Sequence, residues 1–182
     1  MDNNPDLDSR LLADRIIFLG GAIDEDLARS IVEKMLFLEA ADPQRDIFIY
    51  INSPGGSVSA GLDIVDAMNQ ISPDVCTICC GLTAGMATIV LSAGASGKRM
   101  SLPNTQIMLS KIFVGSLGKF RDRFTQSLEI MWLTDKMNAI LSKATGRSSA
   151  EIQADAERDV CLSAEEASGY GLIDRIVDRS VS

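Results

Sequence analysis

The stretch Gly81-Leu82-Thr83-Ala84-Gly85-Met86-Ala87 separates a run of β-forming residues, 75–80, from an apolar helical run, 88–95. A strand that turns sharply into a helix is where an α/β hydrolase mounts its nucleophile, with the side chain exposed at the turn. Gly85 stands where such a turn carries serine or cysteine. The stretch therefore predicts the elbow of a hydrolytic enzyme that lacks its nucleophile.

The segments before the elbow repeat the order strand, turn, helix. Strands are predicted at residues 16–19, 46–51 and 75–80, and helices at residues 25–41, 58–71 and 86–93. The second strand is apolar at nearly every position, which is typical of a sheet covered on both faces. This repetition predicts right-handed βαβ crossovers and a parallel sheet.

After the elbow the pattern predicts shorter elements and one long helix. Strands are expected at residues 98–102, 106–114 and 172–177, and helices at residues 119–145, from Ser148 and from Ser163 to Gly169. Either the whole apolar stripe on the long helix is core, or one face of it is core and another is a subunit contact. The stripe comprises Phe120, Phe124, Leu128, Met131, Trp132, Met137, Ile140 and Leu141. No linker or repeat divides the chain, so we expect one α/β domain over residues 1–182 with a short polar tail at about residues 1–8.

Composition excludes several classes of function. The chain has 182 residues, 46% hydrophobic and 23% charged, with a net charge of −8, which argues against binding to nucleic acids or anionic membranes. No apolar run approaches the roughly 20 residues that span a bilayer. We expect a cytoplasmic protein without metal or cofactor.

The sequence contains no histidine, which excludes a Ser-His-Asp unit and a histidine-ligated metal from this chain. The four cysteines, Cys76, Cys79, Cys80 and Cys161, do not form a paired zinc pattern. The Cys76-x-x-Cys79 spacing is also found in redox pairs. The alternation of residues along the predicted strand, however, places these cysteines in a buried strand and favours a role in the core. A reducing compartment fits this usage.

Four groups of residues carry a family resemblance. They are Ile49-Tyr-Ile-Asn-Ser-Pro-Gly-Gly-Ser57, Ala95-Ser-Gly-Lys-Arg99 with Leu102-Pro-Asn104, Ala156-Glu-Arg-Asp159, and Ser163-Ala-Glu-Glu-Ala167 followed by Tyr170-Gly-Leu-Ile-Asp174. In this order, from about Ser9 to Val177, the chain resembles ClpP, the proteolytic subunit of the ATP-dependent Clp protease. The resemblance implies a ClpP/crotonase-like fold and a chamber made of two heptameric rings.

The resemblance also implies how the catalytic residues are replaced. The family serine, in Gly-Gln-Ala-Ala-Ser-Met-Gly, falls on Gly85, and the family histidine, in Met-Ile-His-Gln-Pro, falls on Ser110. The triad aspartate falls on Asp155, either as an orphan triad member or as a structural carboxylate, and the second reading is favoured. The oxyanion hole would use the backbone N–H groups of Gly56 and Met86, which side-chain replacement leaves in place.

The pattern is most similar to ClpR, the non-catalytic paralogues that share mixed rings with active ClpP. That resemblance implies three kinds of partner: active ClpP paralogues, a AAA+ unfoldase of the ClpA, ClpC or ClpX type, and unfolded protein as substrate. A plastid member would lie in the stroma. Phe48 and Tyr50 are candidates for docking the unfoldase, or for the core, and Ala154 replaces an arginine that joins rings in some members.

Two other functions are kept as alternatives. One is an active Clp-type serine endopeptidase with a non-standard site, for which Ser110 with Lys111, or Thr83, are the available groups. Adjacent strand residues point to opposite faces, which disfavours a Ser110–Lys111 dyad. The other alternative is a crotonase-like acyl-CoA enzyme, which requires a carboxylate facing the elbow.

Overall fold

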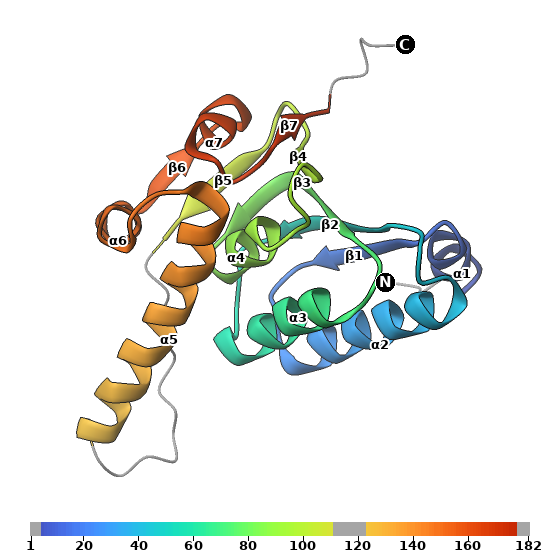
Figure 1. The fold of residues 1–182 in the computed structure, drawn as a ribbon, viewed down its shortest axis with the longest axis horizontal. Helices are drawn as coiled ribbons and strands as arrows, with labels where there is room; N and C mark the ends of the chain where they lie inside the picture. The colour runs from blue at the N-terminus through green and yellow to red at the C-terminus, as the bar shows by residue number, and fades with distance from the viewer. Residues whose placement is uncertain (1–4, 111–122, 178–182) are drawn as a thin grey trace.

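A computed structural model describes residues 5–110 and 123–177, and Figure 1 shows the arrangement of its helices and strands. The elements run α1 Pro5–Ala13, β1 Ile16–Gly20, α2 Glu25–Ala41, β2 Ile47–Ser53, α3 Val58–Gln70, β3 Val75–Ala84, α4 Met86–Ser92, β4 Arg99–Ser101, β5 Gln106–Leu109, α5 Arg123–Thr145, α6 Ser149–Glu157, β6 Val160–Leu162, α7 Ala164–Tyr170 and β7 Arg175–Ile176. The α/β class predicted from the sequence is confirmed.

One sheet, mostly parallel, organises these elements. Strands β1, β2, β3, β4 and β7 lie side by side in that order, and each pair is parallel. The far end of β3 leaves β4 and pairs with β5, and β6 pairs with β5 in the antiparallel direction. The predicted parallel βαβ order of the first three strands is therefore confirmed.

The main core lies between the sheet and helices α2, α3 and α4, with α2 and α3 packed side by side (Figure 1). Along β2 the inward residues Ile47, Ile49 and Ile51 are fully buried, whereas Phe48 and Tyr50 on the other face are half-buried. Phe18, next to Tyr50, is 53% exposed. The prediction of a sheet covered on both faces is wrong for residues 5–110 and 123–177, because the helices among them cover one face of β1 and β2 and leave Phe18 on the other face exposed.

Other differences concern where elements begin and end. Helix α1 begins at Pro5, inside the predicted polar tail, and β3 extends to Ala84 instead of ending at Cys80. Strand β6 was not predicted, since three residues carry little periodicity. The predicted strand residues 112–114 and helix residues 119–122 lie outside the described residues.

The apolar stripe of α5 divides between core and surface. Leu133, Met137 and Leu141 are buried, while Met131 and Trp132 are 62% and 57% exposed. Leu128 is exposed as well, and the side chains of Phe120 and Phe124 lie outside the described residues. The prediction that the whole stripe is core is therefore wrong. The exposed half is available for a subunit contact.

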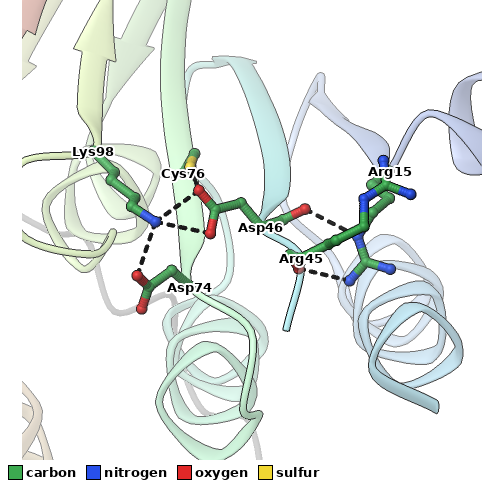
Figure 2. Close-up of polar contacts among 6 residues, drawn as sticks. All are labelled: Arg15, Arg45, Asp46, Asp74, Cys76 and Lys98. Atoms are coloured by element: carbon green, nitrogen blue, oxygen red, sulfur yellow. Dashed lines mark hydrogen bonds and ion pairs between the residues drawn. The ribbon is translucent and has the colours of Figure 1, made fainter. Parts of the chain in front are cut away.

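Charged side chains meet where three adjacent strands begin (Figure 2). Asp46, Asp74 and Lys98 directly precede β2, β3 and β4, and the Lys98 ammonium contacts both carboxylates at 2.6 and 2.9 Å. The Cys76 thiol donates to Asp46 at 3.5 Å, and burial, together with the Asp46 charge, raises its pKa to about 12. Cys76 and Cys79 are buried, as predicted for core cysteines.

Arg15 holds the end of α2 against the start of β2. Its guanidinium is buried and donates to the carbonyls of Leu38, Asp42, Arg45 and Asp46 at 2.9 to 3.1 Å. Figure 2 shows the bonds to Arg45 and Asp46. A cation near the last turn of a helix interacts favourably with the carbonyls there, and here it adds to the bond that the Asp42 amide already makes to the Leu38 carbonyl. Arg15 therefore acts as a side-chain cap for the helix that covers the core.

Replacing Arg15 by alanine is expected to lower the free energy of unfolding by about 3 kcal/mol, because buried carbonyls lose charge-assisted hydrogen bonds. Urea denaturation followed by circular dichroism measures the change. Arg45→Ala is the control, since Arg45 is exposed and contributes only its carbonyl to this contact. Equal losses in the two variants would contradict the capping role.

Candidate functional site

The elbow lies where β3 changes neighbours. Gly81 has φ +75°, and beyond it residues 82–84 pair with β5, while Thr83 also aligns with Ser53 of β2. Gly85 follows with φ +54° and ψ −124°, and α4 begins at Met86. A non-glycine residue is strained in this conformation, as a nucleophile is at the elbow of a hydrolase.

The space at Gly85 is open toward Ser110. A Cβ on Gly85 would lie 3.6 Å from the Ser110 hydroxyl oxygen, 3.6 Å from the Pro54 carbonyl oxygen and 3.9 Å from the Gly55 Cα. These are ordinary van der Waals distances, so a Cβ fits there without displacing backbone. The structure therefore brings together the two positions that the resemblance assigns to nucleophile and base.

The Gly55–Gly56 turn has no such space. A Cβ on Gly56 would lie 2.2 Å from the Ile23 carbonyl oxygen, and one on Gly55 would lie 2.9 Å from the Met86 nitrogen. Hydrogen bonds from the Ile23 amide to Gly55 and from the Ser57 amide to Ile23, at 2.9 and 2.7 Å, hold the turn in place. Packing alone thus requires both glycines, whether or not the site is catalytic.

The two predicted oxyanion donors lie on the two segments that meet here, the Gly55–Gly56 turn and the start of α4. Gly56 belongs to the turn and Met86 is the first residue of α4. Within the part of the chain that the structure describes, neither backbone N–H donates a hydrogen bond. An oxyanion hole requires donors without an internal acceptor, so the predicted role of these two amides stays a prediction.

Asp155 does not join the other two positions. Its Oδ2 accepts a 2.8 Å hydrogen bond from the Tyr170 hydroxyl of α7, and its Oδ1 forms an ion pair with Arg158. The Tyr170 bond lowers the pKa of Asp155 below its ordinary value, Arg158 acts in the same direction, and burial opposes both. Between described residues, no hydrogen bond links Asp155 to Ser110.

Thr83 cannot replace the missing nucleophile, because its side chain is completely buried. Its hydroxyl contacts the Cys79 sulfur at 2.9 Å and the Ile51 carbonyl at 3.5 Å, beneath the elbow. No substrate reaches that oxygen in this arrangement. Lys111, the partner in the alternative dyad with Ser110, lies outside the described residues.

The open face of the sheet carries the predicted docking residues. Phe48 and Tyr50 pack against a small cluster of Cys76, Ile78 and Met100. Phe18 stacks on Tyr50 with ring centroids 5.5 Å apart. Phe18 was not predicted as a docking residue. In the structure, burial alternates along β1 and places Phe18 on the same exposed face as Tyr50.

Other kinds of site find little support in the described residues. They contain no cluster of three or more acidic, cysteine or histidine side chains that would hold a metal ion. None of their helices is long and apolar enough to cross a membrane.

Comparison with known proteins gives a family for the chain. The sequence profile of the Clp protease family matches residues 2–180. The ATP-dependent Clp protease proteolytic subunit 1 of Gloeobacter violaceus is 49% identical over 172 residues, an alignment that covers 94% of this chain and 87% of that protein.

Alanine substitutions test whether a Cβ is excluded by packing at Gly56 but tolerated at Gly85. Gly56→Ala is expected to cost more than about 3 kcal/mol of unfolding free energy, because its methyl group meets backbone. Gly85→Ala is expected to cost about 1–2 kcal/mol, from backbone strain alone. Urea denaturation of both variants measures the difference, and equal costs would refute it.

Proposed function

The chain belongs to the Clp protease family, and we propose that within it the protein is a catalytically silent, ClpR-like subunit of the ATP-dependent Clp protease core. One observation carries the proposal: the elbow residue Gly85 has no side chain, and the residue facing it is Ser110 rather than a base. Such a subunit shapes the chamber and its entrances, while active paralogues cleave the unfolded substrate.

The absence of a nucleophile and of a base rules out the usual acyl-transfer chemistry. Without a nucleophile at position 85 no acyl-enzyme forms, and without an imidazole no hydroxyl near the elbow has its usual base. The Gly56 and Met86 amides remain, but an oxyanion hole and binding alone supply about 10³ to 10⁴ over the reaction in water. That is too little for useful degradation of proteins.

The two alternatives find less support. A relocated peptidase site requires an accessible hydroxyl beside a base, but Thr83 is buried and no described acid or amine contacts Ser110. An acyl-CoA enzyme of the crotonase type requires a carboxylate at the elbow, whereas Asp155 is engaged by Tyr170 and Arg158. The silent subunit is therefore the reading that the site favours.

Exposed apolar side chains support a role in an assembly. On α5 the exposed residues are Leu128, Met131 and Trp132, and on α2 they are Leu36 and Phe37. Contiguous exposed apolar patches mark protein interaction sites. We propose that these surfaces contact active ClpP paralogues in mixed heptameric rings.

The open sheet face is the proposed contact for the partner that uses ATP. Phe48 and Tyr50, with Phe18 beside them, offer aromatic surface to an apolar loop of a AAA+ unfoldase of the ClpA, ClpC or ClpX type. The substrates would be the unfolded proteins that the unfoldase delivers. This docking role rests on the family resemblance together with the exposure of that face.

Serine restored at Gly85 alone is not expected to recover activity, because no base accompanies it. We expect wild type to leave both a fluorogenic peptide and an alkyl fluorophosphonate unreacted, and Gly85→Ser to cleave no peptide and to react with the fluorophosphonate only slowly. The double variant Gly85→Ser/Ser110→His should react with the fluorophosphonate about 10² to 10⁴ times faster than Gly85→Ser, since a general base contributes that much. Labelling of the wild-type chain would contradict the proposed function.

Mixed assembly is tested by co-expressing the tagged chain with a catalytic paralogue of the same host. Native mass spectrometry of the purified complex is expected to show rings that contain both chains. A fluorophosphonate should label only the paralogue, so the number of labels equals the number of its copies. A tagged chain that is monomeric and without any paralogue would refute this role.

A further inference from the structure

One buried threonine connects the elbow to the strand that leads to Ser110. Thr88 lies in α4 and is only 1% exposed. Its backbone N–H donates to the Gly85 carbonyl at 3.1 Å, and its hydroxyl donates to the Met108 carbonyl of β5 at 2.9 Å. A single residue therefore contacts both the nucleophile position and the strand that carries the residue facing it.

The β3–β5 ladder ends beside this contact. Its last pair is Ala84 with Met108, and Ser110 follows two residues after Met108. On the other edge of β5, Leu109 pairs with β6, which does not belong to the elbow. The Thr88 hydroxyl thus holds β5 to the elbow side at the last paired residue before Ser110.

The surroundings of Thr88 fix the direction of its hydroxyl. The same oxygen lies 3.2 Å from the Thr83 carbonyl, so the single hydroxyl hydrogen meets two acceptors on two adjacent strands. The Ser92 hydroxyl donates to the Thr88 carbonyl at 2.7 Å, and Ser92 is buried as well. A buried carbonyl that loses its donor is costly, and each acceptor here favours the observed placement of Thr88.

We propose that Thr88 is a positioning residue that sets where position 110 lies relative to position 85. A Cβ on Gly85 would lie 3.6 Å from the Ser110 hydroxyl oxygen, and the Thr88 bridge maintains this approach. The inference rests on the proposed function, which assigns these two positions to a missing nucleophile and a missing base. It adds a hydrogen-bonded constraint on the β5 side to the packing that fixes the elbow on the side of the Gly55–Gly56 turn.

The first test uses the natural chain and its Thr88→Val variant, which removes the hydroxyl and keeps a branched side chain of similar size. Amide hydrogen exchange measured by mass spectrometry is expected to become about tenfold faster in peptides that cover residues 106–110, because that end of β5 opens more easily. Exchange in α2, which is remote from the contact, should remain unchanged.

Thr83→Val is the matched control. Thr83 is also completely buried, but its hydroxyl contacts Cys79 of β3 and the Ile51 carbonyl of β2 rather than β5. The two variants therefore lose equally buried hydroxyl groups, and only one of these groups reaches β5. We expect Thr83→Val to leave exchange over residues 106–110 unchanged.

The second test uses the full chain carrying Gly85→Ser/Ser110→His and an alkyl fluorophosphonate as the probe. The serine oxygen forms a bond to phosphorus, fluoride leaves, and the hydroxyl proton passes to the imidazole. Adding Thr88→Val is expected to lower the maximal labelling rate about tenfold, because a displaced base is much less effective. The probe concentration that gives half-maximal labelling should not change, and Thr88→Ser, which keeps the hydroxyl, should preserve the rate.

Thr88→Ala is a second route if valine is not accommodated in the core, and Thr83→Ala is then its control. Exchange over residues 106–110 that is unchanged by the Thr88 substitution, or changed equally by the Thr83 control, would overturn this inference while leaving the proposed function intact. Labelling of the wild-type chain by the fluorophosphonate would instead overturn the proposed function.

Discussion

The fold depends on a close backbone approach at the end of β2. Gly55 and Gly56 fit between Ile23 and the elbow with no room for a Cβ, and hydrogen bonds to Ile23 keep the turn there. This contact aligns the loop after β1, the end of β2 and the start of α4. Because each of these segments continues into the main core, the position of the elbow is set by packing rather than by the chemistry performed there.

That constraint explains how the elbow keeps its shape with glycine at position 85 and serine at position 110. Substitution at Gly56 meets backbone, whereas a Cβ at Gly85 has only ordinary contacts. Packing therefore preserves the main-chain donors and leaves positions 85 and 110 free to change. Asp155 follows the same logic, since its bonds to Tyr170 and Arg158 give it a structural reason to persist without a catalytic one.

The sequence predicted the features that depend on local pattern. The parallel strands and the helices that start at Ser148 and Ser163 follow from periodicity and cap residues, and in the structure a capping box begins each of these two helices. It failed where tertiary contacts decide the outcome. Which face of β2 the helices cover, and toward which neighbour Asp155 turns, depend on residues distant in sequence, and β6 is too short to carry a pattern.

The exposed apolar residues connect these observations. Phe18 on the sheet, Phe37 on α2, and Met131 and Trp132 on α5 are each more than half exposed in the single chain. Leaving that much apolar surface in water costs free energy that association recovers, at roughly 25 cal/mol for each Å² buried. The apolar run of β2 predicts a sheet that is covered on both faces. That prediction holds only if another chain covers the face of Phe48 and Tyr50. These exposed surfaces therefore agree with the proposed role of the chain in a larger assembly.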